Sequence, residues 1–178
     1  MTFEPSDTLS ITPRVIYQKI STDGFNRQEV FNLYANPFTT TRPAVTFNER
    51  EQHLLLQEAF EDETLIADLV AEVEFDGVTA TSVTSYTDRS ILVSRDASAL
   101  TGSVSVDLGF PDAGVNLPSN LRDTTDVEAF TQELRLASNG DGALQWVIGG
   151  FYSSTDRFYR QRLPTPGYDA FTDRVLGA

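Results

Sequence analysis

The segment Thr131–Ser154 limits the fold more than any other part of this chain. Two runs of alternating apolar and polar residues flank a turn rich in Gly, Asn and Asp, a pattern that predicts a β-hairpin. The apolar face of the first run comprises Phe130, Leu134 and Leu136, and its opposite face comprises Thr131, Glu133 and Arg135. If the loop covers residues 138–142, the second run adds three residues to the apolar face: Leu144, Trp146 and Ile148.

A second hairpin is predicted around Asp76-Gly77, a dipeptide typical of a two-residue type I′ turn. Before this turn, alternate positions are all apolar: Leu65, Ala67, Leu69, Ala71, Val73 and Phe75. Three of the intervening positions carry carboxylates: Asp68, Glu72 and Glu74. The return strand runs from Val78 to about Ile91. Pairing across the turn then sets Val73 against Ala80 and Ala67 against Tyr86.

The rest of the chain adds one strand at residues 10–20 and several longer connections. Residues 22–63 have no strand period and are predicted as a long loop with a helical turn at residues 28–34. Residues 93–126 are a second long connection, with a short β-ribbon at residues 103–108. The last strand extends towards Tyr159, and the tail from Leu163 is loop-like. About five strands result, joined alternately by short turns and long loops.

Two all-β architectures fit this pattern. Strands about ten residues long, with an apolar face, a charged face and alternating short and long connections, are typical of a segment of an antiparallel transmembrane β-barrel. The short turns would then be periplasmic and the long loops extracellular. A soluble antiparallel β-sandwich alternates in the same way, with its apolar face on a core. A transmembrane helix is excluded, because no run of about 18 apolar residues is present.

Charge and cysteine content exclude several classes of function. The formal net charge is −13, from 13 basic and 26 acidic residues. We expect no nucleic-acid partner, because such a surface repels a phosphate backbone. Cysteine is absent, which excludes disulfides and thiolate metal sites. Nothing in the sequence indicates a catalytic group or a cofactor, so we expect that the protein is not an enzyme.

Three segments resemble strands of a known family: Thr81–Arg89 (TSVTSYTDR), Phe130–Ser138 (FTQELRLAS) and Gln145–Ser153 (QWVIGGFYS). Their residues, order and spacing are similar to the β-barrel portion of TonB-dependent outer-membrane receptors, over roughly residues 64–157. This resemblance favours the barrel over the alternative, a secreted β-sandwich module that binds glycans.

The resemblance implies a receptor of the bacterial cell outer membrane that imports a scarce nutrient, such as an iron–siderophore, cobalamin or a carbohydrate. In such receptors a plug closes a barrel of about 22 strands and contacts the TonB energy-transducing complex. Residues 1–178 show neither a signal peptide nor a plug. We therefore expect one partial barrel domain in contact with outer-membrane lipid, a fragment of a longer receptor whose missing plug would contact TonB.

Candidate site residues follow from the two faces of the predicted strands. Three aromatic residues are predicted at the membrane interface: Tyr86, Trp146 and Tyr152. Five charged residues are predicted to face the lumen, as a hydrated wall: Asp68, Glu72, Glu74, Glu133 and Arg135. Gly149-Gly150 lies within a strand and predicts a bend or close packing in the barrel wall. The sequence does not identify residues that bind a substrate.

Two further features contain residue types that can bind metals. His53 is the only histidine and lies in a polar stretch, where we expect a solvated loop residue. Glu58, Glu61, Asp62 and Glu63 carry the oxygen ligands that Ca²⁺ prefers, but they lack the spacing of an EF-hand. We expect no bound metal at either place.

Overall fold

The structure is a computed structural model that describes residues 1–25, 48–49, 51–52, 54–110 and 117–177. Eight elements are present in these residues: β1 (Phe3–Ser6), β2 (Leu9–Thr22), β3 (Ala59–Phe75), β4 (Val78–Asp96), α1 (Ser98–Asp107), β5 (Asn120–Ser138), β6 (Val147–Arg162) and α2 (Tyr168–Leu176). The helical turn predicted at residues 28–34 lies outside the described residues.

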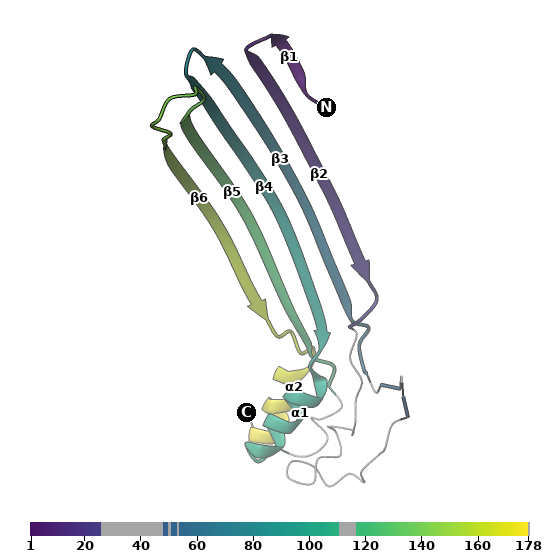
Figure 1. The fold of residues 1–178 in the computed structure, drawn as a ribbon. Coiled ribbons are helices and arrows are strands. Elements are labelled where there is room, and N and C mark those ends of the chain that lie inside the picture. The colour runs from purple at the N-terminus through teal and green to yellow at the C-terminus, as the bar shows by residue number, and fades with distance from the viewer. Residues whose placement is uncertain (26–47, 50, 53, 111–116, 178) are drawn as a thin grey trace. The chain divides into compact units, whose positions relative to one another are not determined.

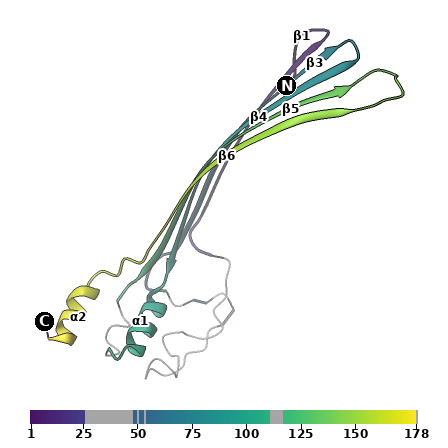
Figure 2. The same ribbon diagram turned by 90° about the vertical axis from the view of Figure 1, so that its left-hand side faces the viewer.

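All six strands of the described part belong to one antiparallel sheet, in the order β1-β2-β3-β4-β5-β6 (Figure 1). Each strand therefore pairs with its neighbour in sequence, as in a meander. Figure 2 shows the strands from the side as a single open layer. The predicted antiparallel β-structure is confirmed, and β1 is an additional short strand that the sequence pattern did not reveal.

The chain divides into two compact units. Unit 1 comprises residues 1–20, 62–91 and 125–159, and unit 2 comprises residues 21–61, 92–124 and 160–178. Unit 1 contains the short turns between strands, and unit 2 contains both helices.

Backbone and side-chain hydrogen bonds join the short turns of unit 1. Gly77 has a φ of +78°, a conformation that favours glycine and that the predicted type I′ turn requires. Asn139 donates from its backbone N to the Gly77 carbonyl at 3.1 Å and from Nδ2 to Thr79 Oγ1 at 3.0 Å. The Glu74 backbone N donates to the Thr8 carbonyl at 2.8 Å. The β1–β2 turn and both predicted hairpin turns are thus connected at one end of the sheet.

Side-chain contacts agree with the register predicted for β3 and β4. Pairing Phe75 with Val78 sets Glu72 opposite Thr81 and Asp68 opposite Ser85. Thr81 Oγ1 donates to Glu72 at 3.4 Å, and Ser85 Oγ donates to Asp68. Both strands are longer than predicted, since β3 starts at Ala59 and β4 ends at Asp96.

The predicted loop at residues 138–142 is wrong in length, because β5 ends at Ser138 and β6 begins at Val147. Gln145 Nε2 donates to the carbonyls of Gly140 and Gly142 at 2.7 and 2.8 Å, which stabilises a longer connection. Leu144 and Trp146 therefore lie in this loop rather than on a strand.

The predicted β-ribbon at residues 103–108 is also wrong, since these residues belong to α1 and its end. The Asp96 carboxylate accepts a hydrogen bond from the Ser98 backbone N at 2.8 Å, which supplies an acceptor at the start of the helix. Ser103 and Ser105 donate to the carbonyls four residues earlier, both at 2.7 Å. The Val-Ser alternation suggested a strand, but within the helix these hydroxyl groups have partners.

The tail was predicted as loop, but it contains α2. Gly167 precedes the helix with a φ of +83°, and Gly177 ends it with a φ of +70°. Phe171 packs near Tyr168 and Phe110, with ring centroids 6.2 and 6.0 Å away. Among the described residues the buried hydrophobic side chains are Ala97 and Phe171, both in unit 2.

Candidate functional site

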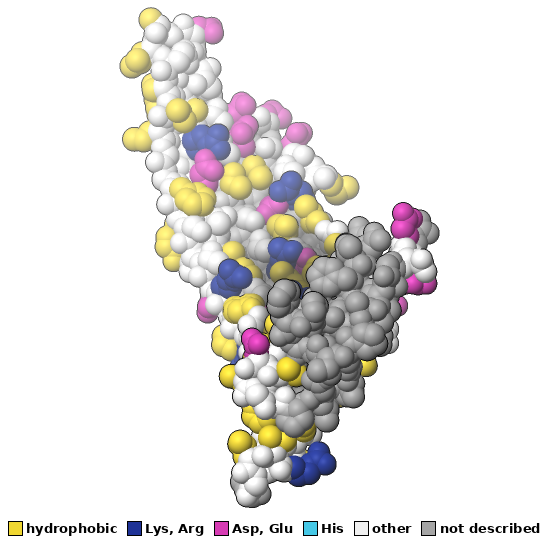
Figure 3. Space-filling view, turned by 90° about the horizontal axis from the view of Figure 1, so that it is seen from below, with side chains coloured by type: hydrophobic (Ala, Val, Ile, Leu, Met, Phe, Trp, Pro, Cys, Tyr) yellow, Lys and Arg dark blue, Asp and Glu magenta, His cyan; other side chains and the backbone are white. Residues whose placement is uncertain are grey.

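The apolar residues of β3 stand on an exposed face of unit 1. Leu65, Leu69 and Phe75 are 38%, 44% and 59% exposed. In the described part of unit 1, no hydrophobic residue is counted as buried. Figure 3 shows hydrophobic side chains on the molecular surface. This arrangement differs from that of a β-sandwich, whose apolar face is covered by a second sheet.

Contacts between strands show which residues of β4, β5 and β6 lie on the same face. Gln132 Nε2 donates to Ser82 Oγ at 3.0 Å, and Thr84 Oγ1 donates to Gln132 Oε1 at 2.6 Å. The rings of Phe130 and Tyr152 lie 6.4 Å apart. Because side chains alternate along a strand, this face of unit 1 also carries residues two or four positions away: Tyr86, Leu134, Leu136, Ile148 and Gly150. We call it the apolar face.

The polar side chains in the middle of the apolar face bind one another. Ser82, Thr84 and Gln132 form the two hydrogen bonds given above. Polar groups that are paired in this way cost much less free energy when they face an apolar environment.

Aromatic residues from four strands lie on the apolar face: Tyr17, Tyr86, Phe130 and Tyr152. All four are exposed, from 39% for Tyr86 to 60% for Tyr152. Tyr86 and Tyr152 were predicted as interface aromatics, and the structure places both on this face. Tyr17 and Phe130 were not predicted as interface aromatics, although the alternation had already placed Phe130 on the apolar face of its strand.

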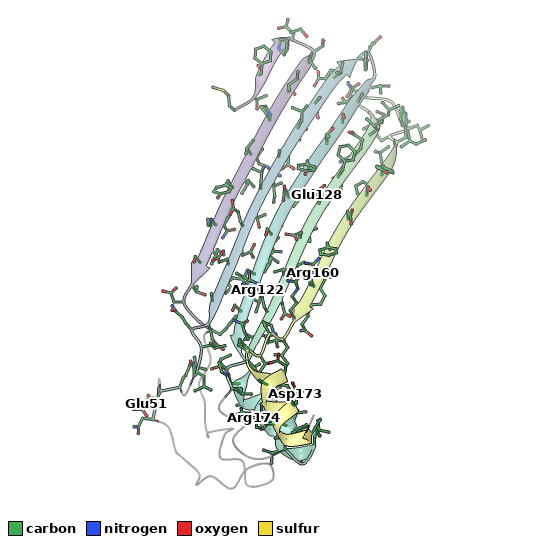
Figure 4. All side chains as sticks on the ribbon, turned by 180° about the vertical axis from the view of Figure 1, so that it is seen from behind. Glu51, Arg122, Glu128, Arg160, Asp173 and Arg174 are labelled. Atoms are coloured by element: carbon green, nitrogen blue, oxygen red, sulfur yellow. The ribbon has the colours of Figure 1, made fainter. Side chains whose placement is uncertain are left out.

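Beyond these aromatic residues, and beyond the apolar stripe on β3, each of the strands β2 to β6 carries a charged residue on the same face. It lies two residues away on β2, β3, β4 and β5 and four residues away on β6. The set is Lys19, Glu63, Asp88, Glu128 and Asp156, with Glu128 labelled in Figure 4. Lys19 Nζ lies 3.1 Å from Glu63 Oε2, and Tyr17 donates to Glu63 at 2.9 Å. The apolar face of unit 1 thus ends at a row of charges, which we call the charged row.

The other end of the apolar face contains a shallow hollow of about 480 Å³. Its lining includes Ala71, Ala80, Leu134, Ile148 and Gly150. Gly149 lies against β5, and a Cβ there would meet the Leu134 carbonyl oxygen at 2.7 Å. This distance supports the predicted close packing at Gly149, whereas Gly150 has open space.

The opposite face of β3 and β4 carries ion pairs. Asp68 accepts from Arg14 Nε at 2.7 Å and from Ser85, and its side chain is 7% exposed. Asp62 accepts from Arg89 Nε at 3.0 Å. Arg14 and Arg89 were not predicted as site residues, because their partners lie 54 and 27 positions away in the sequence.

The remaining predicted polar residues differ in their surroundings. Glu72 accepts from Thr81, and Glu133 pairs with Arg135 at 2.7 Å. Glu72 and Glu74 line a polar hollow of about 600 Å³ together with Glu4 and Asp7. All five predicted residues belong to unit 1.

The acidic run before and within β3 does not form one site. Glu58 accepts from the Asp96 backbone N at 3.0 Å, Asp62 pairs with Arg89, and Glu63 pairs with Lys19. Across the described ranges, no group of three or more His, Asp or Glu side chains is arranged to hold a metal ion. His53 lies outside those ranges.

Trp146 is 40% exposed in the loop after β5. Its backbone N donates to Ser138 Oγ at 2.9 Å, and its carbonyl accepts from the Ser138 backbone N at 2.9 Å. The side chain therefore belongs to the turn end of unit 1, at the opposite end of the strands from the charged row.

The helices in the described ranges are all too short, or too polar, to cross a membrane. Comparisons of the sequence with models of protein families and with curated proteins find no match.

Proposed function

We propose that the chain forms part of the wall of a transmembrane β-barrel, of the kind found in TonB-dependent receptors of the bacterial outer membrane. The observation that carries the proposal is the exposed apolar face of unit 1. Large apolar side chains in water raise the free energy of a protein, and their contact with lipid removes that cost. The resemblance of residues 64–157 to receptor strands supports the type of barrel.

The height of the apolar face supports this proposal. On β3 it extends from Leu65 to Phe75, ten residue steps, before Glu63 begins the charged row. At about 3.3 Å per step the stripe is about 33 Å long. A strand tilted by about 40° would project it to about 25 Å, which is the height of the apolar band of an outer-membrane barrel.

The aromatic residues also support a membrane position. Tyr17, Tyr86, Phe130 and Tyr152 lie next to the charged row, and Trp146 lies near the turn end. In outer-membrane barrels, aromatic girdles flank the apolar band at both interfaces. The short turns would then face the periplasm.

The face with the Arg14–Asp68 and Arg89–Asp62 pairs would line the lumen. Lumen-facing positions in such barrels are polar and hydrated, and ion pairs there neutralise charge without contacting lipid. The sheet would need further strands at both of its edges, because unpaired backbone groups cost several kcal/mol each in a bilayer. In an intact receptor this wall would enclose a path for an iron–siderophore, cobalamin or a carbohydrate, with transport energised through TonB.

Membrane insertion of the 178-residue chain tests the proposal. Trp146 is the only tryptophan, so its fluorescence reports on one place. We expect the chain, diluted from urea into phosphatidylcholine vesicles, to gain β-structure by circular dichroism and to shift its tryptophan emission to the blue. Quenching by brominated lipids should be strongest for bromine near the headgroups, because the turn end would lie at the interface.

The state of the chain in solution without lipid is the second test of the proposal. The proposal predicts that the chain needs detergent to remain monodisperse in solution. A monodisperse monomer in detergent-free buffer, with a cooperative thermal transition and no response to vesicles, would contradict it.

A further inference from the structure

Three arginines and a threonine line a hollow of about 210 Å³ in unit 2: Arg122, Thr124, Arg160 and Arg162. Arg122 and Thr124 belong to β5, and Arg160 and Arg162 belong to the neighbouring strand β6. Figure 4 labels Arg122 and Arg160 on these two strands. We call the four residues the basic hollow. It contains three of the 13 basic residues of a chain whose net charge is −13.

The register of β5 and β6 explains why these residues meet. Gln161 Nε2 donates to Asp123 Oδ1 at 2.8 Å, so these two side chains are cross-strand neighbours on one face. Antiparallel pairing then brings Arg122 near Arg162 and Thr124 near Arg160 on the other face. Asp123, which also accepts from Arg95 at 2.7 Å, therefore points away from the basic hollow.

Like charges placed opposite one another on paired strands destabilise a sheet. The positively charged guanidinium groups of Arg122 and Arg162 repel one another, and an anion bound between them would reduce this repulsion. Guanidinium groups bind phosphate through two parallel hydrogen bonds, and the Thr124 hydroxyl adds a further donor. The hollow is several times larger than the roughly 30 Å³ that a water molecule occupies in the liquid, so it has room for a compact anion.

The geometry points to a binding site for a phosphate monoester in the basic hollow, carried by a lipid headgroup or free in solution. A long polyanion such as a nucleic acid does not fit, because the acidic chain around the hollow repels it. All four residues of the basic hollow belong to unit 2, whereas the barrel proposal rests on unit 1. The phosphate site can therefore be confirmed or rejected without deciding the barrel proposal.

Binding of inorganic phosphate to the full chain in a non-ionic detergent provides the first test. The Arg Nε–Hε signals are followed by NMR as phosphate replaces chloride at constant ionic strength. We expect saturable shifts for the unchanged protein. The double variant Arg122→Gln/Arg162→Gln should bind at least about tenfold more weakly, because charge-assisted hydrogen bonds are lost. Both substituted residues are exposed, so we expect the double variant to retain its fold. Circular dichroism checks this.

The matched control is Arg135→Gln/Arg157→Gln, which removes one arginine from each of the same strands away from the hollow. It should bind phosphate within about twofold of the unchanged protein. Equal weakening in both double variants, or no saturable binding in the unchanged protein, would overturn the site.

Vesicles of phosphatidylcholine with and without phosphatidate distinguish the source of the phosphate group. Stronger binding with phosphatidate that is lost in Arg122→Gln/Arg162→Gln, and retained in the control, would support the site and assign a lipid headgroup. Phosphate-dependent NMR shifts without any effect of phosphatidate would support the site and assign a free phosphate monoester.

Discussion

Units 1 and 2 differ in whether they bury a large apolar side chain. In unit 1 the large apolar residues lie on an exposed face. By contrast, the side chain of the carboxylate Asp68 is only 7% exposed. In unit 2 Phe171 is 6% exposed and lies against Phe110 and Tyr168. An apolar surface without cover suits lipid, whereas a buried aromatic ring suits water. The comparison teaches that, among the described residues, a large apolar side chain is buried only in unit 2, as the proposed lipid contact of unit 1 would require.

The largest expected effect concerns the buried ring of unit 2. Phe171→Ala should destabilise α2 by about 3 to 5 kcal/mol, because it removes a buried ring and leaves a cavity. Hydrogen exchange of the α2 amides measures this, including the Phe171 N that donates to the Gly167 carbonyl at 3.0 Å. Phe75→Ala in unit 1, where the ring is 59% exposed, should leave these amides protected. Equal loss of amide protection in both variants would contradict the prediction that the Phe171 ring specifically stabilises α2.

A charge on the apolar face of unit 1 tests the proposed contact with lipid. Leu69→Arg should weaken insertion into vesicles by about 2 to 4 kcal/mol, because it places a cation within the apolar band. Val70→Arg is the control, since it introduces the same charge one residue along β3 and thus on the opposite face. Partitioning between buffer and vesicles is the measurement. A larger effect of Val70→Arg would reverse the assignment of the two faces.

The ion pairs on the polar face of unit 1 should contribute less. Asp68→Ala is expected to lower the free energy of unfolding by about 1 to 2 kcal/mol, since it removes hydrogen bonds from Arg14 and Ser85 to a nearly buried carboxylate. Glu133→Ala should cost less than about 1 kcal/mol, because its pair with Arg135 is exposed. Urea titration of the folded chain in detergent compares the two variants. The prediction fails if Glu133→Ala is the more harmful.

The smallest effect is a pH dependence of the contact between Asn48 and Glu51. The Asn48 backbone N and Nδ2 donate to Glu51 Oε2 at 2.9 and 3.1 Å, and these bonds lower the pKa of the Glu51 carboxyl. The contact is therefore stabilising above the ordinary pKa of glutamate, and this stabilisation is lost as pH falls through the lowered pKa of Glu51. NMR titration of Glu51 Cδ measures the pKa. Asn48→Ala should raise it, and an unchanged pKa would contradict the role of Asn48.

The difference between units 1 and 2 also explains which parts of the structure could be predicted from the sequence. The alternation from Leu65 to Phe75 and the turn at Asp76-Gly77 are local signals, so the β3–β4 hairpin and its two faces followed from them. The ion-pair partners of Arg14 and Arg89 could not be predicted from local signals, because they depend on which strands pair and in what register. In α1, Val and Ser alternate as they would in a strand, and the local pattern does not reveal the helix, at whose start Asp96 accepts a hydrogen bond from Ser98. Unit 2 carries few periodic signals, and most of the errors fall there.

Asn139 has a consequence for the alignment of the central strands. The connection between β4 and β5, residues 97–119, is too long to fix their register. From the other end of the strands, Asn139 binds the Phe75 and Gly77 carbonyls and Thr79 Oγ1. Sliding β5 along β4 by two residues would move Asn139 by about 7 Å and break all three bonds, although every side chain would keep its face. Asn139, together with the Gln132 contacts to Ser82 and Thr84, thus distinguishes the native alignment from even-numbered shifts, which the alternation of the strands alone permits.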